Sequence, residues 1–168
     1  MDFAMTDEQE LLLESVREFC DRYFTEDVIK EMYETGDMPD EIAEAYRDAG
    51  FGLMGIPEEY GGIPCDKVTL GMMIEELYHS SGCNHILYQN SLTAFDIVEF
   101  GTPEQIQKYM DAYMETGWPL CSLSISEPGA GSDNRNMSCT AKKQDDGTYR
   151  LNGQKTWVTM GAKLPYTI

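Results

Sequence analysis

Residues 121–133 read CSLSISEPGAGSD and predict a strand that runs directly into a glycine turn. Leu123 and Ile125 alternate with serines, which is the two-residue period of a half-buried strand. The Pro-Gly-Ala-Gly run at 128–131 then ends the strand and lets the backbone approach a ligand closely. With the hydroxyl of Ser132 added at the turn, this stretch suits a ligand that has a polar ring and a phosphate.

A second segment, NGQKTWVT at residues 152–159, places the flat indole of Trp157 beside the hydroxyl of Thr159. Taken alone, the first stretch is as typical of an ordinary strand and tight turn, and Trp157 is more typical of a core aromatic. The presence of both segments, in this order, favours a ligand site.

The two segments resemble the flavin-contacting motifs of the acyl-CoA dehydrogenase family, and the resemblance covers the whole chain. Thr6–Gln9 resembles the opening helix of that family, Ile56–Gly62 its interhelical loop and Gly101–Gln105 the start of a later helix. Family members are much longer and continue into a C-terminal helical bundle. The resemblance therefore implies that these 168 residues are the N-terminal portion of an enzyme.

The resemblance implies FAD as cofactor, with six contact residues: Leu123, Ile125, Ser126, Ser132, Trp157 and Thr159. Backbone groups of Leu123 and Ile125 are expected at the pyrimidine edge of the flavin. Ser126 stands where the family usually has the threonine that approaches N5, so it keeps the donor but loses the methyl group. Ser132 is expected near the pyrophosphate and the substrate, Trp157 against the isoalloxazine, and Thr159 on its N5/O4 side.

The catalytic base is unknown from these residues, because the bases of the family lie in its C-terminal helical domain. Glu127, which precedes Pro128, is expected to hold the turn. The resemblance also places Tyr88 and Gln89 on a helix that lines the acyl cavity, where their bulk and polarity favour a short-chain or polar acyl-CoA. The alternative is that Tyr88 packs in the helical core. The 87–89 run is also similar to the crotonobetainyl-CoA reductase branch, as is the loop at Pro57.

Charge divides the chain into two parts. Residues 1–118 hold 26 acidic and 6 basic residues, whereas residues 119–168 hold 4 and 6. We therefore expect a domain boundary near 117–119, with an N-terminal helical domain at 1–118 and the start of a β domain at 119–168. No basic stripe is present to meet nucleic acid. The acidic surface favours solubility, with docking of a basic redox partner as the alternative.

Five scattered cysteines lack metal-ligand spacing, and the two histidines lack a partner pattern, so no metal site is predicted. The start of the chain is acidic and not typical of a signal peptide, and no apolar run is long enough to cross a bilayer. These features favour a reducing, cytoplasmic location.

The predicted fold class is α+β: an all-α helical bundle followed by the first strands of an incomplete β-barrel-like domain. Five helices are expected: from Thr6, from Pro39 to Gly50, around 70–82, from His85 to Phe100, and from Thr102. Turns at Asp146-Gly147 and Asn152-Gly153 separate candidate strands at 140–144, 148–151 and 155–159. A further strand is expected to begin at 165–168.

By resemblance, the enzyme interconverts acyl-CoA and 2,3-enoyl-CoA, works with an electron-transfer flavoprotein and forms a homotetramer in fatty acid metabolism. This chain alone is expected to be inactive and to bind FAD weakly. Two alternatives stay open: a flavin oxidase or monooxygenase of the same fold, and a degenerate, non-catalytic interaction module.

Overall fold

The computed structural model describes residues 4–168, except for the side chains of residues 89–91. The chain forms two compact units, Met1–Pro119 and Leu120–Ile168. We call them the helical unit and the β unit, and each is described by itself.

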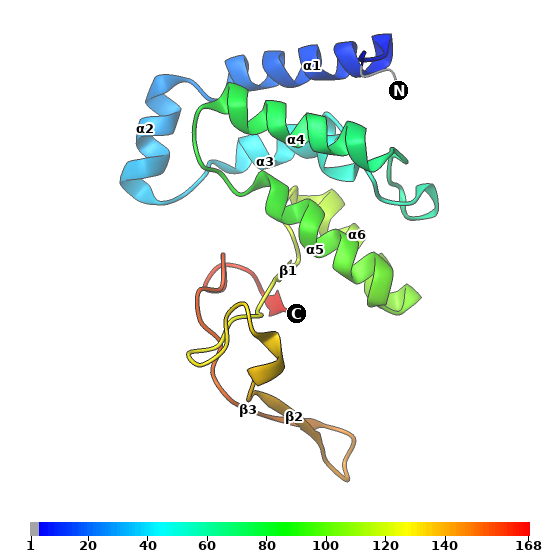
Figure 1. The fold of residues 1–168 in the computed structure, drawn as a ribbon, viewed down its shortest axis with the longest axis vertical. Coiled ribbons are helices and arrows are strands. Elements are labelled where there is room, and N and C mark those ends of the chain that lie inside the picture. The colour runs from blue at the N-terminus through cyan, green and yellow to red at the C-terminus, as the bar shows by residue number, and fades with distance from the viewer. Residues whose placement is uncertain (1–3) are drawn as a thin grey trace. The chain divides into compact units, whose positions relative to one another are not determined.

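The helical unit contains six α-helices among its described residues (Figure 1). Its elements are α1 (Asp7–Tyr23), α2 (Glu26–Thr35), α3 (Asp40–Asp48), η1 (Phe51–Leu53), η2 (Glu58–Tyr60), α4 (Lys67–Ser81), α5 (Leu87–Phe100) and α6 (Pro103–Thr116). Helices α1 and α4 pack side by side.

Side-chain caps explain where several of these helices begin. Thr6 and Gln9 form a capping box at α1, and Thr102 and Gln105 form another at α6. Asp66 accepts hydrogen bonds from two backbone amides at the start of α4. These caps satisfy amides that have no partner within the helix, so the sequence itself sets these boundaries.

The core of the helical unit is built around Phe19 of α1. Its ring lies 5.0 Å from the ring centre of Tyr23, 5.6 Å from that of Phe51 and 6.0 Å from that of Tyr46. Tilted and edge-on contacts at such distances stabilise aromatic pairs beyond the area they bury. Residues of α2, α3, α4 and the start of α5 complete this core.

The five predicted helices are confirmed, but the helix expected from His85 begins at Leu87, and α2 was not predicted. Helix α2 has ten residues and buries only Met32. With a single buried position, its apolar pattern is too short to distinguish it from a polar loop.

The β unit contains two small sheets. Strand β1 (Cys121–Ser122) pairs in parallel with β4 (Tyr166–Thr167), and β2 (Thr140–Lys143) pairs antiparallel with β3 (Tyr149–Asn152). The predicted hairpin at Asp146-Gly147 and the strand near the chain end are therefore confirmed. A short 3₁₀ turn, η3 (Asn134–Asn136), follows β1 and precedes β2 in the sequence.

The strand predicted at 155–159 is wrong, because these residues form a loop and turn. Trp157 has φ 59° and Met160 has φ 58°. Such left-handed backbone is uncommon for residues other than glycine and is incompatible with a pleated strand. The strand predicted from residue 121 is also shorter than expected, since ladder pairing covers only Cys121–Ser122.

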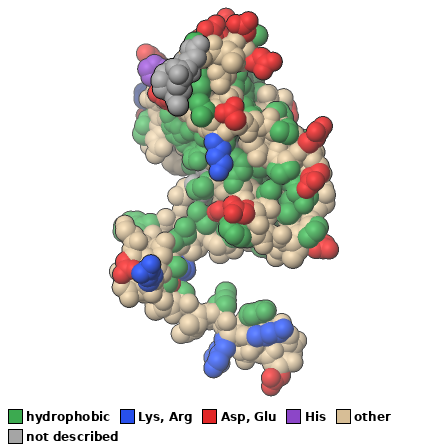
Figure 2. Space-filling model, turned by 45° about the vertical axis from the view of Figure 1, so that its right-hand side comes forward, with side chains coloured by type: hydrophobic (Ala, Val, Ile, Leu, Met, Phe, Trp, Pro, Cys, Tyr) green, Lys and Arg blue, Asp and Glu red, His purple; other side chains and the backbone are tan. Residues whose placement is uncertain are grey.

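The uneven charge of the sequence appears on the surface. Figure 2 shows acidic side chains scattered over the visible face of the helical unit, whereas Lys and Arg side chains stand out along the β2–β3 hairpin. No helix within residues 4–168 is both long and apolar enough to cross a bilayer.

Candidate functional site

Two backbone-directed contacts join the segments at 121–133 and 152–159. The amide of Thr156 donates to the carbonyl oxygen of Ser126 at 2.9 Å. The ammonium group of Lys155 donates to the carbonyl oxygen of Ile125 at 2.8 Å. The two segments that were singled out in the sequence are therefore in direct contact.

Glu127 fastens the glycine turn from inside. Its backbone pairs with Ala130 through two hydrogen bonds, which close the turn at 128–129. One carboxylate oxygen accepts the amide of Ser138 at 2.6 Å and its hydroxyl at 2.9 Å. The other accepts the amide of Cys139 at 3.1 Å and lies 3.0 Å from the Lys155 ammonium.

The environment of Glu127 keeps its carboxylate ionised. The side chain is only 2% exposed. The amide of Ser138 holds the pKa of Glu127 well below its usual range, and Lys155 and Cys139 add to this effect against the opposing effect of desolvation. A carboxylate with this many donors is a poor proton acceptor, which agrees with the expected role in holding the turn.

The backbone that follows β1 pairs with the chain end along one edge, and along its other edge the Ile125 carbonyl accepts from Lys155. Ser122 and Ser124 exchange backbone hydrogen bonds with Ile168 at 2.8 and 2.7 Å. Because successive amides of an extended chain point to alternate sides, the amides of Leu123 and Ile125 face away from β4. These are the two residues whose backbone was expected at the pyrimidine edge of a flavin.

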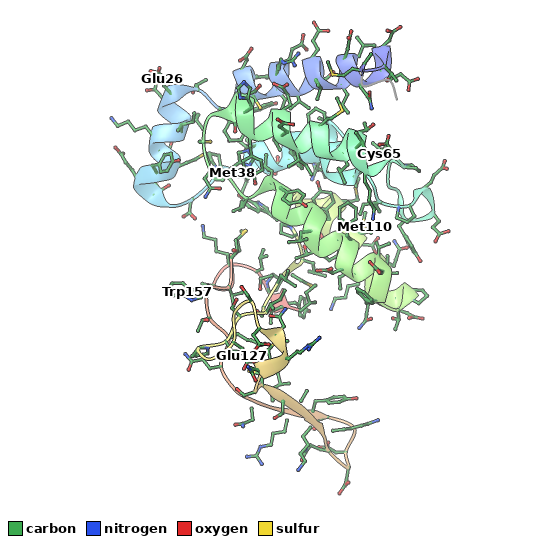
Figure 3. The ribbon with its side chains drawn as sticks, in the orientation of Figure 1. Glu26, Met38, Cys65, Met110, Glu127 and Trp157 are labelled. Atoms are coloured by element: carbon green, nitrogen blue, oxygen red, sulfur yellow. The ribbon has the colours of Figure 1, made fainter. Side chains whose placement is uncertain are left out.

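Trp157 presents its indole to the surface of the β unit. Its side chain points outward from the loop (Figure 3), and the residue is 94% exposed. Monomeric proteins seldom expose an indole fully, and its left-handed backbone adds strain that is typical of ligand sites. Thr159, two residues further, is also exposed.

The two predicted serine donors differ in setting. Ser126 is half-buried and adjoins Glu127, whereas Ser132 is exposed beyond the glycine turn. Across residues 4–168, neither hydroxyl makes a hydrogen bond that would occupy it. Both are available to a ligand.

The predicted substrate residues lie in the helical unit. Tyr88 is on α5 and is half-buried. Gln89 is also on α5, but its side chain lies outside the described residues. Their role in substrate binding stays a prediction.

Lys155 and Ser138 had no predicted role, and the structure assigns them the contacts that hold the site together. A signal was present in the sequence: Lys155 is the only base between Arg150 and Lys163, and Glu127 is the only acid between 120 and 132. An isolated pair of opposite charges in two interacting segments indicates an ion pair. Among the described residues, no group of three or more His, Cys, Asp or Glu could hold a metal ion.

Comparison with protein families gives two adjoining matches. Residues 6–116 match the family model for the acyl-CoA dehydrogenase N-terminal domain, and residues 122–168 match the model for the middle domain.

Individual relatives agree with these matches. The probable acyl-CoA dehydrogenase YdiO of Escherichia coli strain K12 is 38% identical over 168 residues, which are 100% of this chain and 43% of that protein. Butyryl-CoA dehydrogenase from Megasphaera elsdenii has a TM-score of 0.78 and 29% identity, with 99% of this chain and 44% of that chain covered. The FAD complex of PigA has a TM-score of 0.77 and 25% identity, with 98% and 43% covered. The chain spans less than half the length of these relatives.

Proposed function

Because this chain belongs to the acyl-CoA dehydrogenase family, we propose that it forms part of the flavin site of an FAD-dependent acyl-CoA oxidoreductase. The observation that carries the proposal is the contact between the segments at 121–133 and 152–159. Through it, the amides of Leu123 and Ile125 and the hydroxyls of Ser126 and Ser132, none of which is bonded within residues 4–168, belong to one small unit with the exposed indole of Trp157.

The residues present fit a flavin. The free amides of Leu123 and Ile125 are suited to the polar pyrimidine edge, and the exposed indole of Trp157 is suited to stacking on a flat ring. The hydroxyl of Ser126 would donate near N5. Thr159, two residues after Trp157, would approach the N5/O4 side of the ring. Ser132, in the turn after Gly131, would donate toward the pyrophosphate and the passing substrate.

The proposed reaction interconverts acyl-CoA and 2,3-enoyl-CoA. FAD, when bound, supplies an acceptor for the β-hydrogen as hydride. The residues of this chain would orient that ring, exclude water from it and place a donor beside it. Glu127 is committed to Ser138, Cys139 and Lys155, so the base that removes the α-proton is expected in a part of the enzyme that this chain does not contain.

A short-chain or polar acyl group is the proposed substrate. Its support is the phenol of Tyr88 on α5, together with Gln89, in a helix that resembles the one lining the acyl cavity in the family. An electron-transfer flavoprotein as acceptor, a homotetramer and a role in fatty acid metabolism are part of the same proposal. The five free cysteines suit a reducing, cytoplasmic compartment.

The test uses the longest natural gene product that contains this chain, which we call the whole protein. We expect it to purify with FAD, and we expect a short-chain acyl-CoA to bleach the flavin in the absence of oxygen. Bleaching by long-chain thioesters alone would contradict the proposed substrate class. A protein that purifies with FAD but reoxidises rapidly in oxygen would instead be an oxidase or monooxygenase of the same fold, and one without affinity for FAD would be an interaction module.

A further inference from the structure

We propose that Lys155 and Glu127 form a positioning clamp that sets the distance between the two flavin-contacting segments. The inference rests on the proposed flavin site. It assigns to the pair a role that is distinct from contact with the cofactor itself.

The ammonium group of Lys155 is the joint of the clamp. It donates to the Ile125 carbonyl at 2.8 Å and lies 3.0 Å from the Glu127 carboxylate, so one side chain holds two consecutive parts of the first segment. It also lies 3.4 Å from the sulfur of Met137. Lys155 lies two residues before Trp157, so the position of Lys155 constrains the backbone that carries the indole.

The Glu127 carboxylate holds the Lys155 ammonium in place. The carboxylate accepts from the amides of Ser138 and Cys139 and from the hydroxyl of Ser138. Because these donors are mostly backbone groups, the carboxylate is held at a fixed place, and Lys155 is held with it. The pKa of Glu127 lies well below the ordinary range, so the carboxylate keeps its charge throughout the neutral range.

Glu127 is the buried member of the pair, and Lys155 is the partly exposed member. The Glu127 side chain is 2% exposed and that of Lys155 is 28% exposed. Removing the Lys155 ammonium takes away the contact to the Ile125 carbonyl, and it leaves the buried Glu127 carboxylate with only its Ser138 and Cys139 donors. Only one backbone hydrogen bond, from Thr156 to Ser126, would then join the segments at this point.

The consequence for a flavin is geometric. Ile125 and Ser126 on one segment, and Trp157 on the other, would have to meet the same ring. Displacing one segment by about 1 Å is enough to lose a large part of such binding and orientation. Lys155 and Glu127 would therefore influence FAD without touching it.

The experiment compares Lys155→Met, Lys155→Arg and Glu127→Gln in the whole protein, with Lys143→Met as the matched control. Lys143 is an exposed cation on β2 of the same unit. FAD dissociation constants and the shape of the flavin absorption band are measured for the holoproteins. Amide hydrogen exchange of residues 122–127 and 155–159 is measured for the apoproteins.

We expect Lys155→Met to raise the FAD dissociation constant about tenfold or more and to alter the flavin band, because the ring loses its fixed partners. Exchange should become faster in both segments even without FAD. Lys155→Arg should restore most of the affinity, and Lys143→Met should behave as the unaltered protein. Glu127→Gln has one acceptor oxygen where the carboxylate has two, so it can accept from Ser138 or from Cys139 but not from both. Because the Lys155 contact to Ile125 is kept, this variant should give an intermediate effect.

Each other outcome overturns the proposal in a distinguishable way. If the unaltered protein does not bind FAD, the proposed flavin site fails and the clamp fails with it. If FAD binds but Lys155→Met leaves affinity, band shape and exchange unchanged, only the clamp fails. If Lys155→Met does not fold, Glu127→Gln decides; if that variant is also unfolded, or folds with unaltered FAD binding, the pair is structural and the proposal is wrong.

Discussion

Ser126 and Trp157 have different chemistry, and this predicts two different effects on the flavin. Ser126→Ala removes one donor beside N5, where negative charge grows as hydride arrives. The loss is worth about 1–3 kcal/mol, or roughly a five- to 150-fold slower flavin reduction, with little loss of FAD. Stopped-flow reduction and FAD occupancy of the whole protein would measure it. A variant that loses FAD but reduces at the normal rate would contradict this role.

Trp157→Ala should have the opposite pattern and lower FAD occupancy more than the rate of reduction. The indole is 94% exposed in the chain, so its removal leaves the fold intact while deleting a large stacking surface. Trp157→Phe should recover part of the affinity. Unchanged occupancy in Trp157→Ala would place the indole away from the flavin.

His85 predicts a pH dependence of stability. Its ring is buried and stacks at 4.3 Å on Tyr78 and at 5.0 Å on Phe24. Neither ring nitrogen meets a hydrogen-bond partner in the part of the chain that the structure describes. Burial lowers the pKa of His85 from 6.5 to about 4, against the smaller opposing effect of the Leu77 backbone. Between these values the unfolded chain binds the proton and the folded chain does not.

Stability should therefore fall as the pH falls from about 6.5 to about 4, by about 3 kcal/mol from this group. Denaturant unfolding across this range would measure the slope. His85→Phe should remove most of it, whereas the control His79→Gln should leave it in place. An equal slope in His85→Phe would assign the pH dependence to other groups.

Which of these residues contact a flavin stays a prediction, whereas their backbone can be compared with the structure. Trp157 and Thr159 could be singled out from their types and spacing. Their conformation could not, because the positive φ of Trp157 is imposed by contacts with a segment thirty residues earlier, such as that of Thr156 with Ser126. Lys155 and Glu127 stand out in the sequence as isolated opposite charges, but the carbonyl of Ile125 comes within reach of Lys155 only in the folded chain.

At the scale of elements, two glycines in left-handed backbone allow a matched comparison. Gly36 ends α2 and Gly117 ends α6, both with φ 72°. A Cβ added at Gly36 would meet nothing within 4 Å, whereas one at Gly117 would lie 2.6 Å from the Ala43 carbonyl oxygen. Gly117 therefore carries a packing requirement in addition to its backbone conformation.

Gly36→Ala should cost about 1 kcal/mol of stability from backbone strain alone. Gly117→Ala should cost about 2 kcal/mol more, because α6 must also move away from α3. Denaturant midpoints of the two variants would measure the difference. Equal costs would mean that the backbone at Ala43 can move away from the added Cβ at little energetic cost.

Elements with local signals were predictable, whereas contacts between distant segments were not. Neighbouring residues determine the capping boxes of α1 and α6 and the Asp146-Gly147 hairpin. Helix α2 has a cap at Thr25, but it buries only Met32. Its sequence therefore has too short an apolar pattern to predict the helix. Pairing of β1 with β4 joins residues more than forty positions apart.

At the scale of the whole molecule, the helical unit should fold without the β unit. Its core around Phe19 draws on residues of α1 to α5 and η1, all of which belong to this unit. We expect a fragment of residues 1–119 to give a far-ultraviolet circular dichroism spectrum dominated by helix and to unfold cooperatively on heating. A spectrum dominated by β structure, or a gradual transition, would contradict an independent helical domain.

The most direct test of the flavin site is a crystal structure of the whole protein with FAD bound. We predict that the Trp157 indole packs against the isoalloxazine ring and that the Leu123 and Ile125 amides meet its pyrimidine edge. We also predict the Ser126 hydroxyl at N5 and the Lys155–Glu127 pair intact behind the ring. A flavin bound elsewhere, with Trp157 exposed to solvent, would contradict the account.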